Sequence, residues 1–157
     1  MFQAMRRQDR QLTRPETEAV LARGLYGVLS INAGDDYGYG VPFSYVYQDN
    51  KIYLHCALEG KKLTLMRRNN KVGFCVVLDA EPKPDKYSMK YRSAMAFGRA
   101  SEVRDPAEQL SALIALVEKY YTDRDHIEKG KVKAAESLHQ TLVIRIDIDH
   151  LTGKVRK

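Results

Sequence analysis

"YLHCALEGKK", residues 53–62, carries the chain from an apolar segment rich in β-prone side chains into a segment with a helical pattern. The first part of this stretch predicts the end of a strand, and Gly60 predicts a tight turn. A short helix is predicted to follow. The stretch therefore places two lysines, Lys61 and Lys62, at a strand-to-helix turn.

This lysine-bearing turn has the features of a phosphate site. Backbone N–H groups at the start of a helix point outward, and the ammonium groups of Lys61 and Lys62 add positive charge. A glycine followed by two lysines is also common in solvated basic turns. The residues by themselves leave both interpretations open.

Short β-prone segments outnumber helical segments in the rest of the chain. The predicted strands cover residues 25–32, 41–47, 51–57, 71–78, 91–103 and 141–149. Helices are predicted after a capping box formed by Thr13 and Glu16, and after Asp105 with Pro106 in the first turn. Because hairpins dominate the connections, the pattern predicts an antiparallel sheet curled into a small barrel with helices at its ends.

Several positions carry more specific predictions. Residues 79–90 are predicted to form a polar loop, and residues 122–137 a loop with some helix. Gly98 interrupts a long strand and predicts a bend or bulge. Pro42 lacks an N–H group, so it is expected at the start of a strand or on an unpaired edge. Tyr45 is expected to cover the barrel or a dimer surface.

Alternation along residues 51–57 sorts the side chains onto two faces of the strand. Ile52 and Leu54 are predicted to lie in the core, so Cys56 is expected to lean inward. Tyr53 and His55 are then expected on the wetter face of the strand.

Composition limits the class of protein. The chain has 157 residues, which is consistent with one domain spanning residues 1–157, and 44% of its residues are hydrophobic. It has no apolar run of the roughly 20 residues that a membrane helix requires and no segment of signal-peptide type, so a cytoplasmic protein is expected. The net charge of +6 would attract phosphates, but the basic residues are scattered, which disfavours a dedicated nucleic-acid binder.

The usual catalytic and metal-binding motifs are missing from the sequence. His55 and Cys56 are neighbours on a strand and point to opposite faces, so they cannot form a dyad with each other. Cys56 and Cys75 match no zinc spacing and no disulfide framework, and free thiols in adjacent strands are expected. No histidine pair has metal-ligand spacing, and no nucleophile elbow, Walker or Rossmann glycine pattern occurs, so no metal is expected.

Three segments carry a family resemblance. They are "MRRQDRQLTRPETEAVLARGLYGVLSIN", "YGVPFSYVYQDNKIYLHCALEGKKLTLMRRNNKVGFCVV" and "YRSAMAFGRASEVRD", in this order. Together they resemble the nitroimidazole-resistance family of flavin-binding split β-barrels, which is related to pyridoxamine 5′-phosphate oxidase. The likeness covers most of the chain, and "YLHCALEGKK" is its most specific part.

The resemblance implies a mainly β (α+β) fold, a six-stranded antiparallel split β-barrel with flanking helices. It also implies a homodimer with FMN in the cleft between the subunits. Lys61 and Lys62, after Gly60, take the place of the basic pair that holds the FMN phosphate in the oxidase relatives. A small-molecule substrate and a nicotinamide reductant are the further expected partners.

The other positions implied to contact the cofactor lie on three strands. They are Val41, Pro42, Phe43 and Ser44 on one strand, His55, Cys56 and Ala57 on the next, and Ser93 on the long strand. The first group faces the isoalloxazine, and the second lies beside the ribityl chain and the phosphate. His55 is also the candidate catalytic residue, because imidazole offers a donor and an acceptor near neutral pH. The alternative is a partly exposed histidine without a functional role.

The sequence also departs from the oxidase. Gly40 stands where that enzyme has an arginine, and its C-terminal substrate-binding tryptophan and arginine have no counterpart, which argues against pyridoxamine phosphate as the substrate. The expected function is an NAD(P)H-dependent FMN reductase of small molecules such as nitroaromatic or 5-nitroimidazole compounds. The alternatives are a non-catalytic flavin-binding module for storage or sensing, and a haem-binding split barrel.

Overall fold

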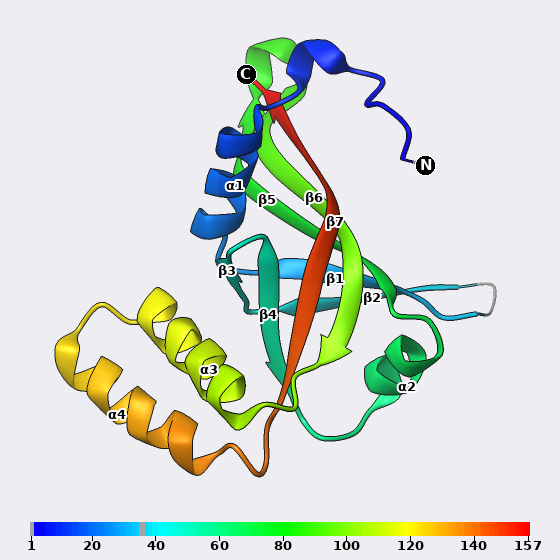
Figure 1. The fold of residues 1–157 in the computed structure, drawn as a ribbon. Coiled ribbons are helices and arrows are strands. Elements are labelled where there is room, and N and C mark those ends of the chain that lie inside the picture. Colours follow the sequence, from blue (N-terminus) through cyan, green and yellow to red (C-terminus); the bar gives the residue numbers. More distant parts are fainter. Residues whose placement is uncertain (1, 35–36) are drawn as a thin grey trace.

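Seven antiparallel strands form one sheet in the part of the chain that the computed structural model describes, residues 2–34 and 37–157 (Figure 1). The strands are β1 (Gly27–Asn32), β2 (Gly38–Phe43), β3 (Val46–Gln48), β4 (Lys51–Cys56), β5 (Lys71–Lys83), β6 (Ser88–Glu102) and β7 (Leu142–Arg156). In space they follow the order β2-β1-β5-β6-β7-β4-β3. The predicted antiparallel split barrel is confirmed, with one strand more than the six that were expected.

Helices flank this sheet on several sides (Figure 1). They are α1 (Arg14–Arg23), α2 (Lys61–Arg68), α3 (Pro106–Tyr120) and α4 (Arg124–Glu136), with short 3₁₀ turns at Gln8–Arg10 and Pro84–Lys86. The predicted start signals of the first and third helices are confirmed. Thr13 and Glu16 form a capping box at α1, and the Asp105 carboxylate accepts hydrogen bonds from the N–H groups of Ala107 and Glu108 at α3.

The additional strand arises because residues 41–47 do not form a single strand. β2 ends at Phe43 and β3 begins at Val46, with Tyr45 fully buried between them. The Tyr45 hydroxyl donates a hydrogen bond to the backbone oxygen of Leu21, so the expectation that Tyr45 covers an outer surface was wrong. β2 pairs with β1 and β3 pairs with β4, so only the second part of the predicted strand 41–47 forms a hairpin with the strand that follows it.

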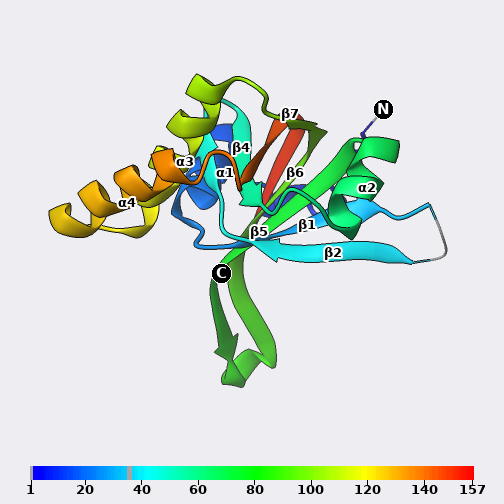
Figure 2. The ribbon, with the colours of Figure 1, turned by 90° about the horizontal axis from the view of Figure 1, so that it is seen from below.

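The segment predicted as a loop, residues 79–90, is instead mostly a two-stranded ribbon. β5 continues to Lys83 and β6 begins at Ser88, with a register shift between Leu78 and Glu81. Figure 2 shows the ribbon extending away from the rest of the sheet. Most of its side chains are exposed on both faces, so the sequence lacks the hydrophobic alternation from which strands are predicted.

The segment predicted as a loop with some helix contains α4, a helix of 13 residues. The Asp123 carboxylate caps it by accepting hydrogen bonds from the N–H groups of Asp125 and His126. Ala134 is the one buried residue of α4 among those described, so its apolar periodicity is weak. Capping and packing against α3 therefore define a helix that the hydrophobic pattern did not reveal.

Two clusters of buried side chains lie on the two faces of β4. Ile52 and Leu54 belong to the barrel interior, and Cys56 packs against this cluster, as predicted. On the other face, Tyr53 and Val143 belong to a second cluster beneath α3. The expectation of a wetter face was wrong for Tyr53, because α3 covers it.

Three local predictions have clear outcomes. β6 shifts its register against β7 between Phe97 and Gly98, and a Cβ atom at Gly98 would lie 2.3 Å from the backbone oxygen of Asp147, so the predicted bulge is confirmed. Pro42 lies on an edge strand, also as predicted. Both cysteines are free thiols. The expectation that they occupy adjacent strands was wrong, because β6 and β7 separate β5 from β4.

Candidate functional site

The start of α2 is open to an external ligand. Gly60 precedes the helix with a φ of 139°, a backbone conformation that favours glycine. Its backbone oxygen accepts hydrogen bonds from the N–H groups of Leu63 at 3.0 Å and Thr64 at 3.3 Å. No side chain of the described residues caps this end, and the first turn contains no acidic residue. The N–H groups of Lys61 and Lys62 therefore have no acceptor within the helix.

The two lysines at this turn have no carboxylate partner within residues 2–34 and 37–157. The Lys61 Nζ atom lies 5.2 Å from the centre of the Tyr39 ring, and the Lys62 Nζ atom lies 5.9 Å from the centre of the Phe43 ring. Positive charge at a helix N-terminus opposes the helix dipole. An anion bound at this turn would remove that conflict and would accept hydrogen bonds from both the backbone and the ammonium groups.

His55 lies on the opposite face of β4 from the barrel interior. It lines a cavity of about 670 Å³ whose other walls come from α3, α4 and the residues that lead into β7, and Ser44 lines the same cavity. The His55 side chain remains partly exposed, and its partial burial lowers the pKa of the imidazole below its ordinary value. The ring is therefore neutral at pH 7 and presents one hydrogen-bond donor and one acceptor.

Cys56 and Ala57 connect the cavity to the lysine-bearing turn. The Cys56 thiol is half-buried, and its burial raises its pKa, while Lys62 has a smaller, opposite effect. The thiol is therefore protonated at neutral pH, which does not suit a nucleophile. Ala57 is exposed and begins the short loop that ends at Gly60.

The structure groups most of the predicted cofactor residues around the ends of β2 and β4. Phe43 lies beside Lys62, and Ser44 lies with His55. Val41 is half-buried and pairs with Leu29 on β1. Pro42, the next residue of this edge strand, is exposed. The site thus has the lysine-bearing turn on one side of the β4 end and a cavity on the other.

Ser93 is not brought to this group within one chain. It pairs with Val77 and Lys154 in the middle of the sheet. It lines a separate cavity of about 280 Å³ together with Arg6 and Arg7. Its contact with a flavin remains a prediction, which requires a second subunit.

Sequence reasoning missed three residues at this site. Tyr39 lies beside Lys61, and Tyr120 and Lys133 line the cavity with His55. The two-residue period of β2 could have identified Tyr39, because Val41 and Phe43 share its face. Lys133 gave no such signal, since α4 was not recognised as a continuous helix.

Residues 2–34 and 37–157 contain no group of three or more histidine, cysteine, aspartate or glutamate side chains that could hold a metal ion. Within the same residues, no helix has the length and apolar character needed to cross a membrane.

Comparisons with known proteins agree with this fold. A family model described as pyridoxamine 5′-phosphate oxidase matches residues 13–155. A proposed 5-nitroimidazole antibiotic resistance protein from Bacteroides thetaiotaomicron is 24% identical, with a TM-score of 0.78, over 92% of this chain and 86% of that protein. No curated protein matches the chain.

Two other similar solved structures belong to FAD-binding proteins. An FAD-binding protein from Mesorhizobium loti is 24% identical, with a TM-score of 0.66, over 94% of this chain and 98% of that protein. An FAD- and haem-binding protein from Mycobacterium smegmatis is 16% identical, with a TM-score of 0.72, over 94% of this chain and 74% of that protein. At these identities the similarity establishes the fold.

Proposed function

The chain belongs to the pyridoxamine 5′-phosphate oxidase family, and on this basis we propose that it binds FMN and reduces small molecules with electrons from NADH or NADPH. The lysine-bearing turn would hold the FMN phosphate. The isoalloxazine ring would lie toward Ser44 and His55. Nitroaromatic compounds, including 5-nitroimidazoles, are the proposed class of electron acceptor.

The observation that carries this proposal is the unpaired basic pair at the start of α2. Lys61 and Lys62 have no carboxylate partner among the described residues, and the first turn offers free backbone N–H groups. Such a turn fits the dianionic phosphate of FMN better than it fits an uncharged ligand. Gly60 leaves the approach open, because a Cβ atom there would have only the Lys62 Nζ atom within 4 Å, at 3.8 Å.

The residues around the β4 end fit the rest of a flavin. The end of β2 offers the half-buried apolar side chains of Val41 and Phe43. When bound, flavin accepts a hydride from nicotinamide and passes electrons to an acceptor. The chain itself orients the ring, and the His55 imidazole, neutral at pH 7, can donate a hydrogen bond to the acceptor or take up a proton from solvent and pass it to the acceptor.

A second copy of the chain is proposed to complete the site. The outer face of the sheet exposes apolar side chains on three neighbouring strands, namely Val28 on β1, Val77 on β5 and Phe97 on β6. Exposed apolar surface of this kind is typical of an interface. Ser93 lies on the same strand as Phe97, so a two-fold dimer is the arrangement in which Ser93 would reach the flavin of the partner.

One observation favours a second candidate, a flavin-binding module without rapid turnover. No carboxylate among the described residues lines the cavity around His55, so no carboxylic acid there could protonate an acceptor in place of His55. If His55 does not serve as a proton donor, storage or sensing of flavin fits the same geometry.

A visible spectrum of the purified protein tests the proposal. We expect flavin bands that bleach anaerobically with NADH or NADPH and return when a 5-nitroimidazole is added. Flavin bands that do not bleach would support the storage module. A haem Soret band without flavin bands would contradict the proposed function.

A further inference from the structure

The cavity beside His55 has walls that the proposed flavin site does not use. Its volume of about 670 Å³ lies within the range of small-molecule pockets. His55 and Ser44 come from the strands, whereas most of the wall comes from α3 and α4. Both views of the ribbon place this pair of helices on the opposite side of β4 and β7 from α2 (Figures 1 and 2).

The inner surface of the helical wall is apolar. Its side chains are Leu113, Leu116, Val117, Tyr120 and Ala134. Four of these five positions are aliphatic, and none carries a formal charge. A surface of this kind favours a ligand with a flat apolar or aromatic body.

The basic side chains on the α4 side of the cavity differ in their partners. The His126 Nδ1 atom lies 2.8 Å from a carboxylate oxygen of Asp123, and the Lys129 ammonium lies 2.6 Å from a carboxylate oxygen of Asp125. Lys133 has no ion pair or side-chain hydrogen bond within the described residues. One uncompensated positive charge therefore lines a mainly apolar cavity.

Neutral polar groups from the strand side also face this cavity without a hydrogen-bond partner among the described residues. The hydroxyl of Ser44 and the imidazole of His55 make no side-chain hydrogen bond with any described residue. By contrast, the Ser137 hydroxyl at the same cavity donates a hydrogen bond to the backbone oxygen of Ala134 at 3.1 Å. Among the described residues, the cavity thus combines an apolar wall, the free cation of Lys133 and free neutral hydrogen-bonding groups.

We propose that this cavity binds the electron acceptor, and that the acceptor is a planar aromatic compound carrying a carboxylate that pairs with Lys133. This inference rests on the proposed flavin reductase function and names the class of its substrate. The aromatic body packs against the wall formed by Leu116 and Tyr120. The carboxylate pairs with Lys133, and the reducible group lies toward His55 and Ser44.

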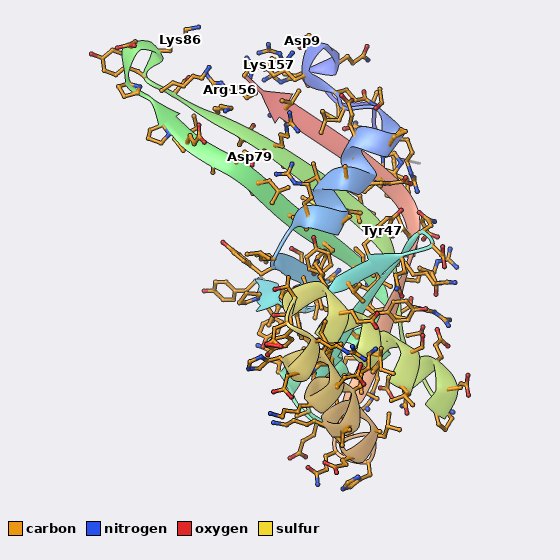
Figure 3. All side chains as sticks on the ribbon, turned by 90° about the vertical axis from the view of Figure 1, so that its left-hand side faces the viewer. Asp9, Tyr47, Asp79, Lys86, Arg156 and Lys157 are labelled. Atoms are coloured by element: carbon orange, nitrogen blue, oxygen red, sulfur yellow. The ribbon has the colours of Figure 1, made fainter. Side chains whose placement is uncertain are left out.

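The test compares two probes of similar shape in direct binding measurements. 4-Nitrobenzoate carries the carboxylate, and 4-nitrobenzyl alcohol has the same ring and nitro group without the charge. Isothermal titration of the purified protein gives both affinities without requiring turnover. The variants are Lys133→Glu, the conservative Lys133→Arg, and Lys86→Glu as a matched charge reversal. Figure 3 shows Lys86 at the tip of the ribbon, at the far end of the molecule from α3 and α4.

We expect the parent to bind the acid more tightly than the alcohol. Lys133→Glu should weaken binding of the acid roughly tenfold and leave binding of the alcohol unchanged, because reversing an exposed charge replaces attraction with repulsion. Lys133→Arg and Lys86→Glu should retain the preference for the acid. The inference is overturned if the parent binds both probes equally, or if Lys86→Glu weakens the acid as much as Lys133→Glu.

Flavin absorbance of the same samples separates this inference from the proposed function. Protein that contains no flavin but shows Lys133-dependent binding of the acid would support the anion-binding cavity while the reductase proposal fails. Protein with a reducible flavin and no preference for the acid would overturn the cavity inference alone. Thermal unfolding of each variant shows whether the fold is retained, and Lys133 is exposed, so a loss of fold is not expected.

Discussion

The helices α2 and α3 begin in opposite ways. At α3, the Asp105 carboxylate caps the first N–H groups, and Glu108 accepts hydrogen bonds from Arg145 at 3.0 Å and from the Tyr53 hydroxyl at 3.0 Å. The bond to Arg145 is the main reason that the pKa of Glu108 lies below its ordinary value. At α2, a glycine and two lysines occupy the corresponding place, with no cap and no acid in the first turn.

The difference indicates two roles for a helix start. The chain satisfies the N-terminus of α3 with its own carboxylates, so this helix end contributes to stability. The N-terminus of α2 keeps its N–H groups free and adds positive charge, which opposes the helix dipole. An arrangement that lowers helix stability fits a site for an external anion, which is why α2 rather than α3 is assigned to the FMN phosphate.

The substitution Lys61→Glu/Lys62→Glu gives α2 the kind of acidic first turn that α3 has. FMN affinity should fall by roughly a thousandfold or more, because two charge-assisted hydrogen bonds of about 1.5–3 kcal/mol each are replaced by repulsion. The free energy of unfolding without flavin should rise by about 0.3–1 kcal/mol per substitution. Fluorescence titration and urea unfolding measure the two effects. A variant that loses stability and keeps FMN would reverse the roles assigned to the two helices.

His55→Ala removes the proposed proton donor from the cavity between β4 and α3. Turnover with a nitroaromatic acceptor should slow by about a hundredfold, the lower end of typical general acid–base contributions. Stopped-flow reduction and reoxidation measure the rates, with flavin content as the control for cofactor binding. Equal rates in the variant and the parent would make His55 an exposed histidine without a catalytic role.

Asp105→Ala opens the start of α3 and leaves α2 unchanged. The free energy of unfolding should fall by about 1 kcal/mol, the usual effect of losing a helix cap. FMN affinity should not change. The matched control is Asp123→Ala, which removes the cap of α4. A large loss of FMN affinity in Asp105→Ala would show that the two helix starts are not functionally separate.

The other end of α3 contributes to stability in a way that depends on pH. The Lys119 ammonium donates a hydrogen bond to the backbone oxygen of Tyr45 at 2.8 Å, and its burial lowers its pKa to about 8 from 10.5. Below the folded pKa the buried charge disfavours the folded state. Since the unfolded chain holds this proton up to the higher pKa, the contribution of Lys119 to the free energy of unfolding should rise between pH 8 and 10.5.

Urea unfolding of the parent and Lys119→Met at a series of pH values tests this contribution. The difference in free energy of unfolding, parent minus variant, should become more positive as the pH rises through that window. Subtraction removes the titration of groups that do not contact Lys119. Tyr45 does contact it, but burial raises the pKa of Tyr45, so Tyr45 acts in the opposite direction only above its ordinary pKa. A difference that does not vary with pH would contradict the assigned pKa.

Local signals explain which parts of the fold could be predicted. The caps at Thr13 and Asp105, the glycine bulge at Gly98 and the edge position of Pro42 each depend on a few neighbouring residues. The β5–β6 ribbon has mostly exposed side chains, so it shows no alternation. α4 has one buried residue among those described, so its helical period was not visible.

The candidate site divides in the same way. Gly60, Lys61 and Lys62 are adjacent in the sequence, so the lysine-bearing turn could be predicted from one stretch. The cavity beside His55 could not, because residues far apart in sequence form it. Lys133 reaches that cavity only through the packing of α4 against α3, a tertiary contact that no local pattern encodes.

Titration of FMN and riboflavin against the parent and Lys61→Ala/Lys62→Ala decides whether the start of α2 holds the phosphate. Riboflavin lacks the phosphate and is otherwise the same flavin, so the ratio of the two dissociation constants isolates the phosphate contact. We predict that the parent prefers FMN by roughly 100-fold or more, that the double variant has little preference, and that both proteins bind riboflavin alike. Arg68→Ala, which removes an exposed charge from the last turn of the same helix, should keep the parental ratio. A double variant that retains the parental preference for FMN would show that the two lysines form a solvated basic turn.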